Sequence, residues 1–191
     1  MEDWVARALA RWPNVPHLYD WLSLDRHGRW RVRGELISRP QISDTIARNY
    51  AADERGCWYF QNGPQRGYVS LETCPLVLLQ QADGSLRDHC GRPVTQAQAA
   101  YLDADGGLCL HTEHGPAALD DRDLEWLLSH LRCNGQPASE AQILAALQSP
   151  SGLQTELTLQ IQEQSLPVHR LDSAGQPKHL GFQRQPSAPE G

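Results

Sequence analysis

The sequence predicts an α+β protein whose antiparallel sheets are built from hairpins and meanders, with a few short helices. Three observations lead to this class. Short links rich in Asp, Asn and Gly separate the apolar runs, and such links favour hairpins because these residues tolerate positive φ. Several runs alternate apolar and polar residues, as half-buried strands do. Strands and helices do not alternate regularly, which argues against a doubly wound nucleotide-binding fold.

The first half of the chain predicts a helix, a hairpin, a second helix and a meander. The helix spans 3–11, with Asp3 as its cap, and ends before two prolines. A hairpin over 21–33 turns at 25–28. A short helix over 41–50 follows Pro40. The meander starts at the aromatic run 57–61 and continues through turns at 62–65 and 82–85 to 89.

The second half predicts, in order, a hairpin at 99–111, a helix from Asp120 or Asp121 to Arg132, a helix at 140–148, a strand at 155–163, and a last hairpin of 166–171 with 178–182. The first helix has an apolar stripe of Leu124, Leu127, Leu128 and Leu131, and Asn134-Gly135 would end it. Ser139 would cap the second helix. In the strand, Leu157, Leu159 and Ile161 alternate with polar residues, so we expect them to be buried.

These elements divide the chain into two similar halves, 1–95 and 96–182, which we expect to pack as one compact unit. The tail 183–191 is polar and rich in proline, so we expect disorder. The hairpins at Asp25 and Asp103, and the helices after Pro40 and Asp120, are each offset by about 80 residues. Either the sequence contains a degenerate duplication, or two sheets simply resemble each other.

Composition predicts a folded cytoplasmic protein. The chain has 191 residues, of which 40% are hydrophobic, so it can bury a substantial core. Five cysteines are scattered without a CxxC pair, which favours reduced thiols over a disulfide framework. No apolar run approaches the roughly 20 residues of a membrane span, and the acidic N-terminus does not resemble a secretory signal. We therefore expect no membrane association.

The distribution of charge argues against nucleic-acid binding. The net charge is −6, and residues 101–191 carry 12 acidic but only 5 basic groups. Binding to a phosphate backbone requires clustered cations. Only one basic stripe is present: Arg29, Arg31 and Arg33 alternate with Trp30 and Val32. Bidentate binding of an anion is one reading of this stripe. An exposed strand face, neutralised by nearby acids such as Asp25, is the other.

The segment from Asp25 to Pro75 carries a family resemblance. It includes Gly28-Arg29-Trp30, Ile37-Ser38-Arg39-Pro40 and the run from Asn49 to Arg66. With these residues the chain resembles a family of proteobacterial proteins of unknown function. A second uncharacterised bacterial family shares the looser scheme Gly-x-Trp, Ile-x-Arg-Pro and Glu-x-x-Pro, here Glu72 to Pro75. The resemblance covers roughly the first two-thirds of the chain. It implies a bacterial cytoplasmic origin and no activity, cofactor or site residue.

The segment after the aromatic run is the best candidate for a ligand site. Established phosphate-loop, dinucleotide, zinc-protease and hydrolase motifs are absent from the sequence. Trp58, Gln61, Asn62 and Arg66 together offer an aromatic wall, two amides and a guanidinium, which suit a small anionic or ring-bearing ligand. The alternative reading assigns the Asn-Gly pair to a turn and the aromatic residues to the core.

Two further clusters have structural alternatives. The metal-capable residues Cys109, His111, Glu113 and His114 lie close together, but their spacing matches no established zinc site. A solvated hairpin end is the other reading, and no cofactor is predicted. The acids Asp120, Asp121, Asp123 and Glu125 fit a helix N-terminus, where carboxylates cap and offset the helix dipole.

These observations favour a cytoplasmic module that binds a small ligand or regulates, without catalytic activity. A small-molecule enzyme of the hydrolase class is the alternative, because catalytic residues often converge only in space. A Cys–His pair within hydrogen-bond reach, with the cysteine exposed, would indicate it. A protein-interaction module or homodimer is the third possibility, and an exposed apolar patch would indicate that.

Overall fold

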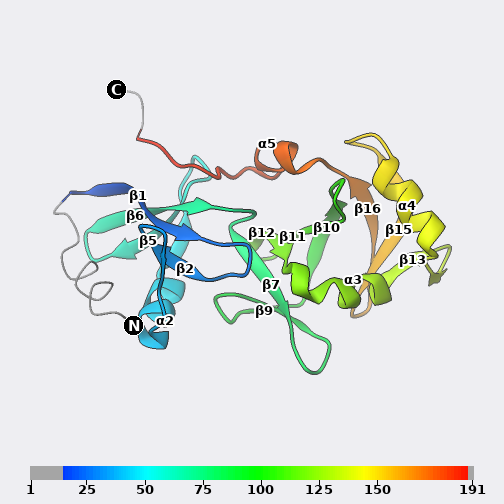
Figure 1. Cartoon of the computed structure of the whole chain (residues 1–191), viewed down its shortest axis with the longest axis horizontal. Helices are drawn as coiled ribbons and strands as arrows, with labels where there is room; N and C mark the ends of the chain where they lie inside the picture. Colours follow the sequence, from blue (N-terminus) through cyan, green and yellow to red (C-terminus); the bar gives the residue numbers. More distant parts are fainter. Residues whose placement is uncertain (1–14, 189–191) are drawn as a thin grey trace. The chain divides into compact units, whose positions relative to one another are not determined.

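The computed structural model describes residues 15–188, so the predicted helix at 3–11 lies outside the described residues. The chain forms two compact units (Figure 1). Unit 1 contains the chain up to Pro75 together with the residues from Gly181 onward, and unit 2 contains Leu76–Leu180. The boundary therefore lies before the predicted one at 95–96. The reason is that β7 (Leu76–Gln80) pairs with β12 (Gly115–Leu119) and so joins the second sheet.

Within its described residues, unit 1 is a six-stranded sheet with one helix. Its elements are β1 (His17–Leu24), β2 (Trp30–Val32), β3 (Glu35–Leu36), α2 (Pro40–Arg48), β4 (Tyr50–Ala52), β5 (Trp58–Asn62) and β6 (Gln65–Leu71), in the sheet order β3-β2-β1-β6-β5-β4. Most ladders are antiparallel, but β1 pairs with β6 in parallel. The helix packs against β5 through the buried Ile46 (Figure 1).

Unit 2 contains a ten-stranded sheet. The remaining strands are β8 (Leu86–Asp88), β9 (Pro93–Val94), β10 (Ala97–Leu102), β11 (Leu108–Thr112), β13 (Leu131–Cys133), β14 (Gln136–Pro137), β15 (Gln154–Ile161) and β16 (Gln164–Arg170). The order is β14-β13-β15-β16-β10-β11-β12-β7-β8-β9, with parallel ladders at β10–β16 and β12–β7. The predicted strand at 155–163 is confirmed, because Leu157, Leu159 and Ile161 are all buried.

The helices of unit 2 are η1 (Asp121–Asp123), α3 (Leu124–His130), α4 (Glu140–Gln148), η2 (Ser173–Gly175) and α5 (Gln176–Leu180). Ser139 caps α4 with a complete capping box, as predicted. The predicted stripe of α3 is partly wrong: Leu127 is buried, but Leu124 and Leu128 are exposed, since α3 begins later than expected and buries Trp126 instead.

Two further predictions of local structure are wrong. Asn134-Gly135 does not end a helix but forms the turn between β13 and β14, where both residues have positive φ. The segment 178–182 is not a strand, because η2 and α5 occupy 173–180. The tail 183–188 is also ordered against unit 1. Its Gln183 amide donates to the Gly56 carbonyl over 3.0 Å.

One turn recurs in both sheets. In the four Asp-x-x-Gly turns that begin at Asp25, Asp53, Asp88 and Asp103, the carboxylate accepts the backbone N–H groups two and four residues later. The glycine of each turn has positive φ, which costs a glycine little. In each turn, the short Asp side chain accepts the hydrogen bonds that a backbone carbonyl would otherwise accept. This side chain therefore sets the register of the hairpin.

The two units share a set of elements. The hairpin at Asp25 corresponds to that at Asp103, and each is followed by a helix with one buried residue, Ile46 in α2 and Ala146 in α4. Each set then closes with a hairpin whose last strand pairs in parallel with the first, β6 with β1 and β16 with β10. The counterpart of α2 is thus α4, not the helix after Asp120, because β12, α3 and β13 intervene in unit 2.

Candidate functional site

The sheet of unit 1 has a core face that includes one predicted site residue. Trp58 and Phe60 are buried, and the Trp58 ring packs on Tyr50 with ring centroids 4.8 Å apart. Because side chains alternate along a strand, Tyr59 and Gln61 point to the opposite face. Trp58 is therefore separated by the sheet itself from Gln61 and from its cross-strand partner Arg66.

Gln61, Asn62 and Arg66 belong to the hairpin of β5 and β6. Gln61 pairs with Arg66 across the ladder, and Asn62 pairs with Gln65 at its end. The Gln61 side-chain amide donates to the carbonyls of Gly63 and Gln65 over 2.7 and 3.1 Å, so it holds the turn. The Arg66 guanidinium lies 4.4 Å from the ring centroid of Tyr59. The structure thus brings these three residues together on one hairpin.

Residues beyond the four predicted ones complete this face, and His17 and Tyr19 among them carried no sequence signal. Tyr59 and Tyr68 are cross-strand partners, and Tyr19 of β1 stacks on Tyr68 with centroids 4.6 Å apart and an interplanar angle of 2°. His17 lies 5.9 Å from the Tyr68 ring. We call this surface, defined by His17, Tyr19, Tyr59, Arg66 and Tyr68, the tyrosine face. Only the parallel β1–β6 ladder brings His17 and Tyr19 to it.

A bulge in β1 places Tyr19. The ladder pairs Leu18 with Gly67 and Leu22 with Val69, so four residue steps of β1 match two of β6. Asp20, inside this irregularity, has φ of 57°, an uncommon value for a residue other than glycine. Bulges re-aim side chains, and here the bulge accompanies the stacking of Tyr19 on Tyr68. Local backbone strain of this kind often marks functional segments.

Asp53 organises the edge of the tyrosine face. Its Oδ1 accepts the backbone N–H groups of Arg55 and Cys57, and its Oδ2 accepts the Arg55 guanidinium and the Tyr68 hydroxyl, the latter over 3.1 Å. Burial would raise the pKa of Asp53, but these hydrogen bonds outweigh it and hold the pKa below its usual value. The carboxylate is therefore an ionised, fully occupied acceptor.

The two arginines of this region differ in their partners. Arg55 is committed to Asp53, and its Nη1 also donates to the Ser187 carbonyl over 3.1 Å. Arg66 has no carboxylate within salt-bridge distance among residues 15–188. The neighbouring Tyr68 hydroxyl raises the pKa of Arg66, so the guanidinium stays charged. Its positive charge is not offset by a paired acid in that part of the chain.

Two arginines of the basic stripe, Arg29 and Arg31, pair with an acid within unit 1. Arg29 and Arg31 both form ion pairs with the buried Asp25, with distances of 2.9 and 3.1 Å. Arg33 instead lies over the Trp21 ring, 5.0 Å from its centroid. The reading in which nearby acids neutralise the stripe is thus supported for Asp25.

The four metal-capable residues of unit 2 lie in different environments. Cys109 is buried in β11, while His111 is partly exposed on the same strand. Glu113 accepts hydrogen bonds from the Thr95 amide and hydroxyl and from the Gln96 amide, and a His114 ring nitrogen lies 2.9 Å from the Pro93 carbonyl. Glu113 and His114 approach each other only to 3.9 Å. These contacts tie His114 to β9 and Glu113 to the segment that follows β9.

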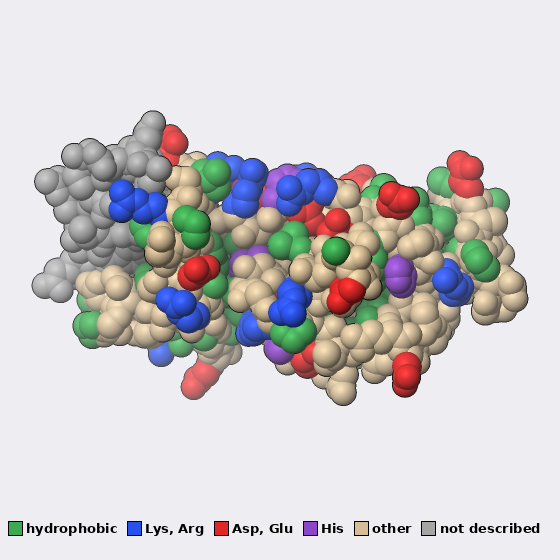
Figure 2. Space-filling view, turned by 90° about the horizontal axis from the view of Figure 1, so that it is seen from below, with side chains coloured by type: hydrophobic (Ala, Val, Ile, Leu, Met, Phe, Trp, Pro, Cys, Tyr) green, Lys and Arg blue, Asp and Glu red, His purple; other side chains and the backbone are tan. Residues whose placement is uncertain are grey.

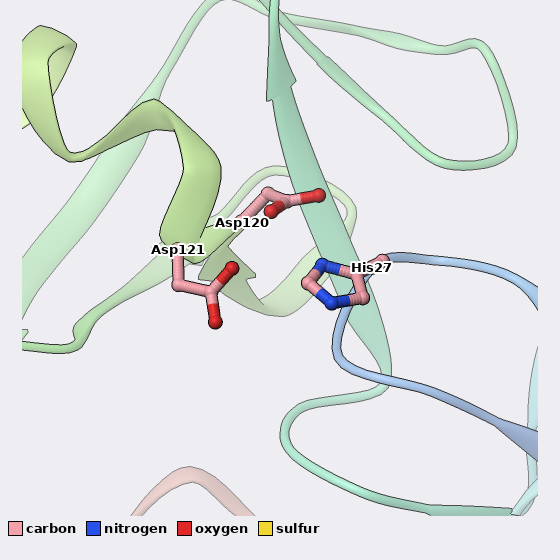
Figure 3. A group of neighbouring side chains, drawn as sticks. All are labelled: His27, Asp120 and Asp121. Carbon is pink, nitrogen blue, oxygen red and sulfur yellow. The ribbon is translucent and has the colours of Figure 1, made fainter.

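The acidic segment has structural roles in unit 2. Asp120 follows β12 and Asp121 begins η1 (Figure 3). Asp120 is buried, caps η1 through the Arg122 amide and pairs with the Arg122 guanidinium. Asp123 accepts the Gln80 amide over 2.7 Å. Capping and pairing therefore account for these two carboxylates. His27, also drawn in Figure 3, belongs to the turn after β1 in unit 1.

A Cys–His contact does occur, at His89 and Cys90. Cys90 Sγ lies 3.6 Å from His89 Nε2, and His89 Nδ1 accepts the Val77 amide. Burial raises the pKa of the Cys90 thiol to about 12 and lowers the pKa of His89 to about 4. A nucleophilic cysteine requires the opposite shift, toward a thiolate. Both groups are neutral near pH 7, so the pair is not arranged for nucleophilic catalysis.

Ser129 and His130 form a second close pair, with Ser129 Oγ 3.0 Å from His130 Nδ1. Both groups, however, face the Trp126 carbonyl, at 2.8 and 2.7 Å. Because a carbonyl only accepts, Nδ1 carries a hydrogen and cannot take a proton from the serine. The pair closes the last turn of α3.

Exposed leucines of unit 2 are relevant to the alternative that the chain is a protein-interaction module or a homodimer. Leu124, Leu128, Leu144 and Leu153 are each about half exposed. On the face drawn in Figure 2, hydrophobic side chains form small, separate spots among polar ones. Scattered apolar residues of this kind are normal on protein surfaces. None of the helices within residues 15–188 is long and apolar enough to cross a membrane.

Comparison with known proteins places the chain in one family without an assigned function. The family model DUF2944, described as "Protein of unknown function (DUF2946)", matches residues 1–187. A comparison with curated proteins found no match. A DUF1285 family protein from Silicibacter pomeroyi DSS-3 has a similar structure, with a TM-score of 0.53 and 15% identity over 86% of this chain and 93% of that chain. A DUF1285 family protein from Shewanella baltica OS155 matches with a TM-score of 0.38 and 15% identity, over 54% of this chain and 86% of that chain. The first of these likenesses concerns the fold alone.

Proposed function

We propose that this chain, which belongs to the family DUF2944, is a cytoplasmic small-ligand-binding or regulatory module without catalytic activity. The proposed ligand is small and anionic or ring-bearing, and it binds on the tyrosine face of unit 1 at Arg66. The resemblance to bacterial families implies a bacterial cytoplasmic origin of the chain, and this implication supports the cytoplasmic assignment.

The environment of Arg66 carries the proposal. A guanidinium that lies on an aromatic ring keeps its edge of N–H donors free for a planar carboxylate or a phosphate. The acid nearest in the network, Asp53, is already occupied by Arg55 and Tyr68. Gln61, directly across the ladder, holds its side chain in the turn and so keeps the hairpin fixed beside Arg66. A positive charge on a rigid support is a suitable anchor for an anion.

The absence of catalytic activity is supported by protonation states. His89 and Cys90 are both neutral near pH 7, and the hydrogen on His130 Nδ1 faces a carbonyl. A general base must be able to accept the proton that it removes, and a thiol nucleophile must ionise. Neither the His89–Cys90 pair nor the Ser129–His130 pair meets these requirements.

The test compares two arginine variants of unit 1. Ligands retained by protein from its native cells, and a panel of carboxylates, phosphates and nucleotides, would be measured by native mass spectrometry and calorimetry. Arg66→Gln should weaken binding at least about tenfold, the loss expected for a charge-assisted hydrogen bond. Arg48→Gln is the matched control, because Arg48 is exposed on α2 and its only described contact is with Thr45. Equal affinity of the Arg66 variant and the parent chain would contradict the proposal.

A further inference from the structure

The last described segment of the chain, Gly181–Ala188, returns to unit 1 and is held there by specific contacts. We call it the C-terminal strap. Phe182 and Pro186 are buried. The Gln183 amide donates to the Gly56 carbonyl over 3.0 Å, and the Leu71 amide donates to the Arg184 carbonyl over 2.8 Å. Backbone hydrogen bonds and buried side chains together define one docked position.

The strap reaches the tyrosine face through Arg55. The Arg55 guanidinium donates to the Ser187 carbonyl with Nη1, and to Asp53 Oδ2 with Nε and Nη2. The same Oδ2 accepts the Tyr68 hydroxyl. The Tyr68 ring contacts Tyr59, on which Arg66 lies, with ring centroids 5.8 Å apart. A continuous series of contacts therefore joins Ser187 to Arg66 within unit 1.

We propose that this series couples the strap to the anion site, so that an anion bound at Arg66 loosens the strap. The inference rests on the proposed function and specifies how the site would regulate. The Tyr68 hydroxyl is the shared group, because it donates to Asp53 while its ring contacts Tyr59, on which Arg66 lies. A positive charge nearby polarises a phenol O–H bond, so the guanidinium of Arg66 makes the Tyr68 hydroxyl a better donor.

The direction of the coupling follows from that arrangement. An anion that draws Arg66 toward itself offsets the positive charge beside the Tyr59–Tyr68 pair, and the bond from Tyr68 to Asp53 weakens. Asp53 then fixes the Arg55 guanidinium less firmly, and Arg55 is the side chain that holds Ser187. Because coupling between two sites is reciprocal, a docked strap in turn lowers the affinity of the site for the anion.

The coupling can be measured without a ligand. In the full-length chain, amide hydrogen exchange of Gln183 and Leu71 reports strap docking, since both amides are held by strap contacts. Arg66→Gln mimics withdrawal of the cation, and Tyr68→Phe removes the shared hydroxyl but keeps the ring. Each variant should accelerate both amides about fivefold or more, which corresponds to one net hydrogen bond.

Tyr59→Phe is the matched control, because the Tyr59 ring supports Arg66 and no hydrogen bond of its hydroxyl within residues 15–188 belongs to the series. It should change exchange by less than about twofold, the usual limit for a neutral surface change. The Ile37 amide, which donates to Trp30 elsewhere in unit 1, serves as the reference. Unchanged Gln183 and Leu71 exchange in both test variants, or an equal acceleration of Ile37, would overturn the coupling. Failure of the proposed function would show separately, as equal ligand affinities of the Arg66→Gln variant and the parent chain.

Discussion

The Tyr68 hydroxyl donates a hydrogen bond to Asp53 Oδ2 over 3.1 Å, and this contact joins the tyrosine face to the turn between β4 and β5. Asp53 thereby serves two purposes with one carboxylate. Its Oδ1 fixes the turn through two backbone amides, and its Oδ2 collects Arg55 and Tyr68. The Asp-x-x-Gly turn at Asp53, a kind of turn that other hairpins of the chain also contain, thus supports the candidate site as well.

Replacement of Asp53 by Asn should therefore destabilise the chain by about 1.5–3 kcal/mol, the range for hydrogen bonds to charged groups. The amide cannot accept from all of the present donors, and it leaves Arg55 without its counter-ion. Asp83→Asn is the control, because Asp83 caps an exposed turn through Ser85 alone. Denaturant unfolding should show a clearly smaller loss of unfolding free energy for the Asp83→Asn control than for Asp53→Asn. A smaller loss for the Asp53 variant than for the control would exclude the proposed role of Asp53.

The core of unit 2 should respond strongly to truncation at Leu159. This side chain is completely buried in β15, so Leu159→Ala should cost about 2–5 kcal/mol. Leu153 lies just before the same strand with a relative exposure of 54%, and Leu153→Ala should change stability by less than about 0.5 kcal/mol. Urea unfolding of both variants measures the difference. Similar losses would show that the face assignment of β15 is wrong.

All five cysteines should react as free thiols after unfolding. The structure contains no disulfide among them, and four are buried. Intact-mass analysis after alkylation in denaturant without reductant should find five labels. In the native state at pH 8 labelling should be slow at every site, since burial raises the pKa of even the partly exposed Cys90 to about 12. Rapid native labelling at Cys90 would contradict the burial of its thiol.

His89 should make stability fall as the pH falls from about 6.5 to about 4. Burial lowers the pKa of His89 to about 4, whereas the unfolded chain binds the proton near 6.5. The unfolded state therefore binds more protons in this window, and protonation favours unfolding. The full effect is on the order of 3 kcal/mol at the lower end. It is absent above the unfolded value.

Replacement of His89 by Asn removes the titration and keeps a side-chain acceptor for the Val77 amide. The variant should start less stable at pH 7 but lose less stability between pH 6.5 and 5 than the parent chain does. His111→Asn, on a partly exposed histidine of the same unit, is the control. Chemical denaturation at a series of pH values gives these slopes. Parallel slopes for the parent and the His89 variant would rule out the buried imidazole as their source.

The sequence signals that succeeded were local. Ser139 capped its helix because the capping box is contained in four residues, and β15 followed from the alternation of Leu157, Leu159 and Ile161. The failures came from weak local signals. Asn134-Gly135 suits a helix end and a hairpin turn equally well, and only the pairing of β13 with β14 decides between them.

The candidate site was partly predictable for the same reason. Gln61, Asn62 and Arg66 lie in one hairpin, so their proximity follows from a turn signal. Strand alternation already separates Trp58 from Gln61, because the two are an odd number of residues apart. Tyr19 could not have been found, since it reaches Tyr68 through a parallel ladder between distant segments and a bulge at Asp20. The docking of the strap is likewise long-range.

Gly56 should be more sensitive to substitution than Gly34, because the strap passes directly over it. Its φ is +74°, and a Cβ at this position would lie 2.2 Å from the Gly181 carbonyl oxygen, a backbone atom that cannot rotate away. Gly34 has a similar φ of +85° but no atom within 4 Å of a Cβ. The two positions therefore share the conformational cost of alanine, and only Gly56 adds a clash.

Gly34→Ala should lose about 1–2 kcal/mol, the cost of a left-handed backbone for a residue with a Cβ. Gly56→Ala should lose a further 1–3 kcal/mol or so, as overpacked sites do, unless the strap moves away. Exchange of the Gln183 amide distinguishes these outcomes, because its acceptor is the Gly56 carbonyl. If the strap is released, the amide exchanges freely while the rest of unit 1 stays protected. Equal stability losses for the two variants, with Gln183 still protected, would show that the strap does not rest on Gly56.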